Sequence, residues 1–357
     1  MQAAKTKMAE VQDEAELRKF GEHFLFMVWD KIRNLPGWPK AWCFKHNKNC
    51  SLNCPDSCGD SGKERLRIGI AGTVCTAWSR MGARLQWLDW TCVLFCIWAW
   101  EMQKWAPRLI LHECTADFEW QNLSKIFSDH EVGSACFSPS DLGIPTNRSR
   151  RYSLLVRRDA VKLRVPYCLD AFAPFCFRRL ATDGQCYNYL EDPCELEKHL
   201  QIMATRRHLP PRQPDGSPWS MRQLLPEGQF QRLLEYERKA AQHRGTDSVI
   251  ANLKQTATFS TLSENVPCLL RGCGNVWNMK SGRHFMKSEF LLIHGISSSR
   301  HGVGSYGIEL TGMRYSQFCA LIGNSMHLAA VGSALGWAIA ESSLLDNSTL
   351  AVREEEA

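Results

Sequence analysis

The sequence lacks any uninterrupted apolar segment long enough to cross a lipid bilayer. Its most apolar run, Trp90–Trp100 (WTCVLFCIWAW), falls far short of the roughly 20 residues that a membrane-spanning helix needs, so we expect a buried helix and no membrane partner. The N-terminal residues MQAAKTKMAEVQDEAELRKF also lack the apolar stretch of a secretory signal. The 16 cysteines are therefore expected to be mostly reduced thiols inside the cell.

The sequence also lacks a strong excess of charge of either sign. The 43 Lys and Arg residues against 37 Asp and Glu give a formal net charge of +6, which suits a polyanionic partner but does not establish one. With 44% hydrophobic residues, the chain of 357 residues can bury the core of one large domain, or of one domain and a smaller module.

Local patterns in the first half predict alternating helices and strands. Helices are expected over residues 8–33, 84–105 and 123–130, and strands over 67–72, from 109 to 111, and over 151–156. Such alternation is typical of an α/β fold with a mainly parallel sheet, in which chemistry sits at the carboxyl ends of the strands. Because Cys75 and Glu113 each follow a predicted strand, we expect them at the same sheet edge.

The second half lacks this alternation. Residues 166–280 contain a proline-rich turn region, HLPPRQPDGSPW, and a helix expected over 227–244, and they are interpreted as a smaller, irregular domain. Residues 315–345 are expected to form two helices separated by a break at Gly323. The division is therefore 1–65, a helix and a Cys-rich segment; 66–165, a core; 166–280, the smaller domain; 281–345, a return to the core; and 346–357, an acidic tail.

Five segments carry candidate chemistry, in the order GTVCTAWSRMG, LILHECTADF, DLGIPTNRSRRYSLLVRRD, RHFMKSEFLLIHGI and ALIGNSMHLAAVGSALGWAI. Each alone has an ordinary structural interpretation. Cys75 could be a core thiol, Glu113 a solvated carboxylate, and Arg148 and Arg150 a surface patch that binds phosphate. Asn324 could be a helix N-cap.

Taken in order and with their spacing, the five segments resemble the motifs of the cytosine-C5 methyltransferase family. The resemblance implies a Rossmann-like methyltransferase core with a smaller inserted recognition domain, and a monomer that acts in the nucleus. It also implies S-adenosylmethionine as cofactor and a cytosine base in DNA as target. A transfer-RNA cytosine methyltransferase remains the alternative enzyme, so RNA stays open as the partner.

The resemblance also assigns roles to single residues. Cys75 would attack C6 of the cytosine, Glu113 would contact ring N3, and Arg150 would donate to O2. Arg148 would fix the site or hold the thiolate by its charge, and Asn324 and Ser325 would line the cofactor pocket. These roles need a base extruded from its stack.

Two features of the sequence depart from the family pattern or lie outside it. No glycine-rich loop after a strand precedes Cys75, since the chain there reads AELRKFGEHFLFMVWD, so a nucleic-acid-binding relative without methyl transfer is the third interpretation. A separate cluster, CFKHNKNCSLNCPDSC, contains Cys43, Cys50, Cys54 and Cys58. Reduced thiols are the expectation there, and zinc ligands are the alternative.

Overall fold

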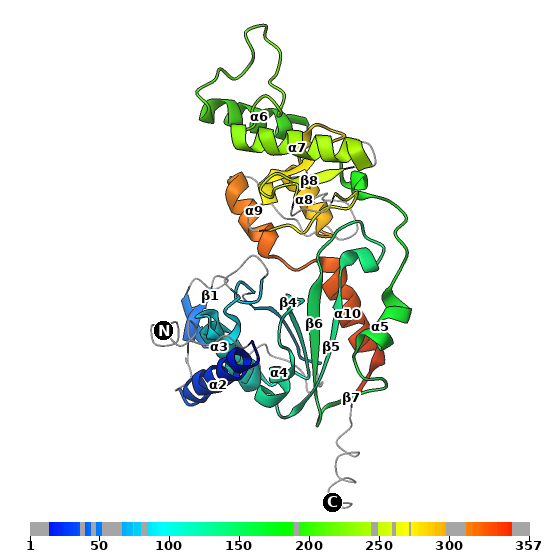
Figure 1. The fold of residues 1–357 in the computed structure, drawn as a ribbon. Helices are drawn as coiled ribbons and strands as arrows, with labels where there is room; N and C mark the ends of the chain where they lie inside the picture. Colours follow the sequence, from blue (N-terminus) through cyan, green and yellow to red (C-terminus); the bar gives the residue numbers. More distant parts are fainter. Residues whose placement is uncertain are drawn as a thin grey trace, which may run out of the picture. The chain divides into compact units, whose positions relative to one another are not determined.

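A computed structural model describes residues 14–35, 40–43, 48–51, 66–73, 75–79, 84–188, 193–243, 249–258, 262–270, 273–297 and 312–344. The chain divides into two compact units, each shown in Figure 1. Unit 1 contains residues 1–136, 150–171 and 335–357, and unit 2 contains residues 137–149 and 172–334.

A four-stranded sheet organises unit 1. Its strands are β3 (Ile68–Gly72), β4 (Leu109–Thr115), β5 (His130–Phe137) and β6 (Arg150–Arg157), in the order β3-β4-β6-β5. Strand β3 runs parallel to β4, with Gly72 opposite Glu113, because α3 (Thr91–Trp105) returns the chain to the start of the sheet. Strand β6 runs antiparallel to β4. The predicted α/β class is confirmed, and the sheet combines a parallel pair with an antiparallel neighbour.

Helices α2 (Glu14–Arg33), α3 and α4 (Gln121–Ile126) cover one face of this sheet (Figure 1). Leu25, Trp29 and Ile32 recur at helical spacing along α2 and are buried against the aromatic residues of α3. Helix α3 ends where Ala106 adopts a left-handed conformation before Pro107. The expectation of a buried helix at Trp90–Trp100 is correct for the inner face only, because Trp90, Val93 and Leu94 are exposed.

The remaining elements of unit 1 are short. Strands β1 (Lys40–Cys43) and β2 (Lys48–Ser51) form an antiparallel pair, and β7 (Val161–Leu163) pairs with β11 (Ser342–Leu344). Two helices cross the unit boundary, α5 (Leu169–Cys176) and α10 (Leu328–Glu341). By length and composition Tyr315–Glu341 could cross a membrane, but it is divided into α9 (Tyr315–Asn324) and α10 by residues 325–327.

Unit 2 combines helices with a small antiparallel sheet. Its strands are β8 (Ile250–Asn252), β9 (Val276–Asn278) and β10 (Arg283–His284), in the order β10-β9-β8. The helices are α6 (Pro193–Arg206), α7 (Glu227–His243), α8 (Lys287–Ile293) and α9, with short 3-10 turns at Pro139–Asp141, Gly184–Tyr187 and Cys273–Asn275. Unit 2 therefore includes residues 281–334, a segment expected from the sequence to return to the core.

A buried ion pair orders the centre of unit 2. The Arg283 guanidinium donates to both carboxylate oxygens of Glu289, at 2.7 and 2.6 Å, and the Glu289 side chain is fully buried. Glu289 also accepts from the Met286 backbone N–H, which caps the start of α8. Because each charge is satisfied by several hydrogen bonds, the pair fixes β10 against α8.

Candidate active site

Cys75 lies in a tight turn just beyond the carboxyl end of β3. The backbone N–H groups of Trp78 and Ser79 both donate to the Cys75 carbonyl, at 3.1 and 3.0 Å. The thiol is partly buried and packs against the core that α2 and α3 form with the sheet. The predicted position of Cys75 at the sheet edge is confirmed.

His112 holds this segment against β4 and was not singled out from the sequence. Its Nε2 lies 2.7 Å from the Thr73 hydroxyl, and its ring packs 4.9 Å from the rings of Trp98 and Phe118. Burial lowers the pKa of His112 to about 3, so the imidazole is neutral at pH 7. The signal in the sequence was a histidine directly after the apolar run Leu109–Leu111.

Replacing His112 should flatten the pH dependence of stability. The unfolded chain binds a proton below pH 6.5 and the folded chain does not, so stability falls as pH falls through this range. Between pH 6.5 and 5.5, the native protein should lose about 1 kcal/mol more unfolding free energy than His112→Gln. Urea titrations at both pH values measure this, with His23→Gln, an exposed histidine of α2, as control. Parallel stability curves for the native protein and His112→Gln would refute the assignment.

Glu113 and Arg150 form an ion pair on the adjacent strands. Arg150 Nε lies 3.1 Å from Glu113 Oε1, and both side chains are largely buried. In the antiparallel register Arg150 stands opposite Thr115, so the two charged residues are diagonal neighbours on one face of the sheet. Glu113 lies inside β4, which continues to Thr115, and not after the strand as the sequence suggested.

Cys114, which follows Glu113 in the chain, belongs to the core cluster against which Cys75 packs. Burial raises the pKa of the Cys114 thiol, and the charges of Cys75 and Glu113 raise it further. Cys114 is therefore a protonated, buried thiol and no nucleophile. The three candidate residues thus lie at the same end of neighbouring strands of unit 1. Cys75 packs against the core cluster that includes Cys114, and Glu113 and Arg150 pair with each other on β4 and β6.

The other predicted site residues belong to unit 2. The buried Arg148 guanidinium donates to backbone carbonyls of Leu269, Gly323 and Ser325, at 3.1, 3.5 and 2.7 Å. Asn324 is the exposed last residue of α9, and Ser325 follows it. Arg148 therefore holds the end of α9 in place. The predicted cofactor contacts of Asn324 and Ser325 stay predictions.

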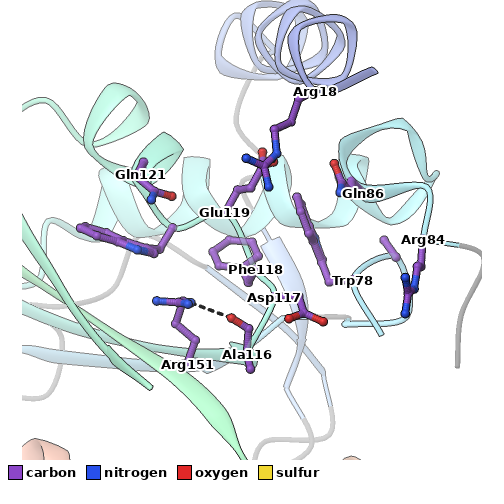
Figure 2. Close-up of a pocket in the computed structure, with 12 residues that line it drawn as sticks. Arg18, Trp78, Arg84, Gln86, Ala116, Asp117, Phe118, Glu119, Gln121 and Arg151 are labelled. Atoms are coloured by element: carbon purple, nitrogen blue, oxygen red, sulfur yellow. Dashed lines mark hydrogen bonds and ion pairs between the residues drawn. The ribbon is translucent and has the colours of Figure 1, made fainter. Parts of the chain in front are cut away.

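A pocket of about 580 Å³ opens beside the Cys75 turn (Figure 2). Figure 2 shows the rings of Trp78 and Phe118 together at its centre, with centroids 5.4 Å apart. Its charged side chains are of both signs: Arg18, Arg84, Arg151, Asp117 and Glu119. Glu119 pairs with Arg18 at 2.8 Å, and Arg151 donates to the Ala116 carbonyl. The pocket therefore presents charged groups of both signs beside two buried aromatic rings.

The described residues do not fit S-adenosylmethionine in the way that the resemblance implies. Strand β3 is at the edge of its sheet, and in the described stretches before Cys75 no strand leads into a glycine-rich loop. The described part of the chain also holds no group of three or more His, Cys, Asp or Glu side chains placed to bind a metal. The side chains of Cys43, Cys50, Cys54 and Cys58 lie outside the described residues.

The chain matches no protein-family model and no curated protein. It is similar to solved structures of methyltransferases. Dnmt2 of S. pombe is 14% identical over 76% of both chains, with a TM-score of 0.42. A DNMT2 mutant of Spodoptera frugiperda is 15% identical over 89% of this chain and 96% of its own, with a TM-score of 0.39. A putative DNA modification methyltransferase from an E. coli prophage is 14% identical over 77% and 79%, with a TM-score of 0.43.

Proposed function

We propose that this chain acts on cytosine in nucleic acid, DNA before RNA, by adding the Cys75 thiolate to C6 of the base. This addition is the activating step of cytosine-C5 methylation. The observation that carries the proposal is the position of Cys75, Glu113 and Arg150 at the same end of three neighbouring strands, with Glu113 and Arg150 paired. The order of the five sequence motifs supports it as well.

The side chains divide the chemistry among them. As the sulfur–C6 bond forms, the π electrons of the C5–C6 bond move into the ring toward N3 and O2. In this proposal Arg150 stabilises the charge at O2, and Glu113 delivers a proton to N3 during addition and takes it back during elimination. C5 becomes enamine-like and takes a proton from water. Loss of the original C5 hydrogen and expulsion of the thiolate then restore the ring.

This sequence of steps gives a test that needs no cofactor. Strands that carry tritium at cytosine C5 should release it into water when incubated with the protein, because addition and elimination exchange that hydrogen. Comparing DNA and RNA strands of one sequence identifies the polymer, and DNA is expected to react faster. Absence of tritium release from both polymers would refute the proposed function.

Replacing Glu113 by Gln should slow tritium release about 100-fold without abolishing it. The amide keeps a polar contact to the ring but cannot transfer a proton, and proton transfer of this kind contributes a factor of about 10²–10⁴. Tritium release under single-turnover conditions measures the effect. Glu131→Gln, which removes an exposed carboxylate from β5 of the same unit, should match the native rate. A native rate for Glu113→Gln would show that Glu113 has no part in the reaction.

Methyl transfer from S-adenosylmethionine stays a prediction of the resemblance. If the cofactor binds, it supplies the methyl group that C5 would receive in place of the solvent proton. Isothermal titration calorimetry with S-adenosylmethionine tests binding without requiring activity. Binding would favour a complete methyltransferase, whereas tritium release without binding would indicate that this chain activates cytosine only.

A second candidate function is a nucleic-acid-binding protein that kept the fold and performs no chemistry. The edge position of β3 and the lack of a glycine-rich loop in the described stretches before Cys75 favour it. It predicts nucleic-acid binding that is unaffected by Cys75→Ala, together with no tritium release.

A further inference from the structure

A second pocket, of about 370 Å³, lies entirely within unit 2 and is here called the basic pocket. It is bounded by the end of α6, the start of α7, the turn at Cys273–Asn275 and the start of α9. Its lining residues include Arg206, Arg207 and Lys254, the polar side chains of Gln229, Asn275 and Ser316, and the rings of His199, His284 and Tyr315.

The charge of the basic pocket has one sign. Arg206, Arg207 and Lys254 supply three cations, and no Asp or Glu is among the lining residues. The pocket beside Cys75 differs, since two carboxylates there offset three arginines. The three side chains are exposed, so water screens their mutual repulsion, and the pocket keeps a net positive charge that attracts an anion.

Two helix N-termini add to this positive potential. Pro226 and Gln229 line the pocket at the first turn of α7, and Tyr315 and Ser316 line it at the first turn of α9. The helix macrodipole places about half a positive charge at each of these ends. Helix N-termini are a common site for binding phosphate, and Glu227 in the first turn of α7 offsets part of the charge at that end.

A histidine in the wall lies close to one of these cations. Burial, together with the charges of Arg206 and Lys287, lowers the pKa of His199 to about 4. Its ring lies 4.6 Å from that of Tyr315. The imidazole is neutral at pH 7, so the positive charge of the pocket comes from Arg206, Arg207 and Lys254.

We propose that the basic pocket binds a phosphate group of a nucleic-acid strand. Arg206 and Arg207 offer planar guanidinium groups that bind phosphate oxygens through paired hydrogen bonds, and Lys254 offers a third charge. Met203 and Leu224 give the pocket an apolar wall against which a sugar can pack. Nucleic acid as the source of the phosphate rests on the proposed function, whereas the preference for phosphate does not.

Binding of fluorescein-labelled single strands to the full chain tests the proposal. The variant Arg206→Gln/Arg207→Gln/Lys254→Gln should bind DNA or RNA at least about tenfold more weakly at low salt. The slope of its log binding constant against log salt concentration should also be smaller in magnitude by about one, because one phosphate contact is lost. The control Lys198→Gln/Arg212→Gln/Arg238→Gln removes the same charge from exposed positions of unit 2 and should bind nearly as the native protein does. Circular dichroism and melting temperature check that both variants fold.

Three further probes separate the possible sources of the phosphate. A strand with neutral methylphosphonate linkages should bind the native protein and the pocket variant equally weakly. Cytidine monophosphate and inorganic phosphate, tested by calorimetry, should bind far more weakly than the strand. Tight binding of the mononucleotide without the strand, or equal losses in the pocket and control variants, would overturn the proposal.

Tritium release from saturating concentrations of strand keeps the two proposals apart. If the pocket variant keeps the native rate at saturation and also the native affinity, the phosphate site is wrong and the cytosine chemistry stands. If no protein releases tritium while the pocket variant alone loses affinity, the phosphate site stands and the chemistry is wrong.

Discussion

Cys75→Ala should abolish tritium release from cytosine C5, with a loss of at least about a thousandfold. The reaction passes through a covalent bond between sulfur and C6, and among the described residues Cys75 is the partly exposed thiol that follows β3. Cys114 in the same core cluster is buried and its pKa is raised, so it cannot substitute as a thiolate. The measurement is tritium released per protein molecule in a single turnover.

Two further cysteine variants test whether the loss is specific to the Cys75 thiol. Cys75→Ser should also be inactive, because a hydroxyl is rarely ionised at neutral pH. Cys186→Ser removes an exposed thiol of unit 2 and should retain the native rate. Substantial tritium release by Cys75→Ala would mean that the exchange proceeds without this thiol.

Arg148→Met should lower the free energy of unfolding of unit 2 by about 3 kcal/mol. The substitution leaves the Leu269, Gly323 and Ser325 carbonyls without their guanidinium donor, and charge-assisted hydrogen bonds contribute about 1.5–3 kcal/mol each. Urea denaturation followed by circular dichroism measures the change. Arg148→Lys keeps the charge but offers fewer donors, so its free energy of unfolding should lie between those of the native protein and Arg148→Met.

Arg179→Met provides the matched control for this prediction. Arg179 is exposed, and its replacement should change stability by less than about 0.5 kcal/mol. An Arg148→Met protein as stable as the native one would show that the guanidinium does not support the end of α9. If Arg148→Met leaves stability unchanged but slows tritium release, Arg148 acts in the reaction, as the resemblance implies.

The regular elements of unit 1 could be predicted because their signals are local. Apolar spacing marked α2, and the short apolar runs before Cys75 and Glu113 marked β3 and β4. The ends of the strands were predicted less accurately. Strand β4 continues through His112 and Glu113 to Thr115, because neighbouring elements bury polar side chains that a sequence pattern assigns to a loop.

The helices near the C-terminus show the same limit. The sequence predicted a break at Gly323, but Gly323 lies inside α9 and the break follows Asn324. Gly323 is buried, and its carbonyl accepts from Arg148 at 3.5 Å. A tertiary hydrogen bond from a residue 175 positions away leaves no trace in the local pattern.

The candidate site was predicted in part for a similar reason. The motif order pointed to Cys75, Glu113 and Arg150, and neighbouring strands of the sheet place them at the same end of the sheet. His112 was missed, since its role depends on Thr73 and two aromatic rings. The basic pocket was missed as a site because its cations come from α6 and from the loop after β8, which only the fold of unit 2 brings together.

The most direct test of the account is to find which atom of the protein bonds to the base. Strands that contain 5-azacytosine carry nitrogen in place of the C5–H group, so C6 is more electrophilic and elimination is blocked. The protein should form a covalent complex with such a strand, and mass spectrometry of its peptides should locate the bond at Cys75. A bond at any other cysteine, or no complex on DNA or RNA, would contradict the account.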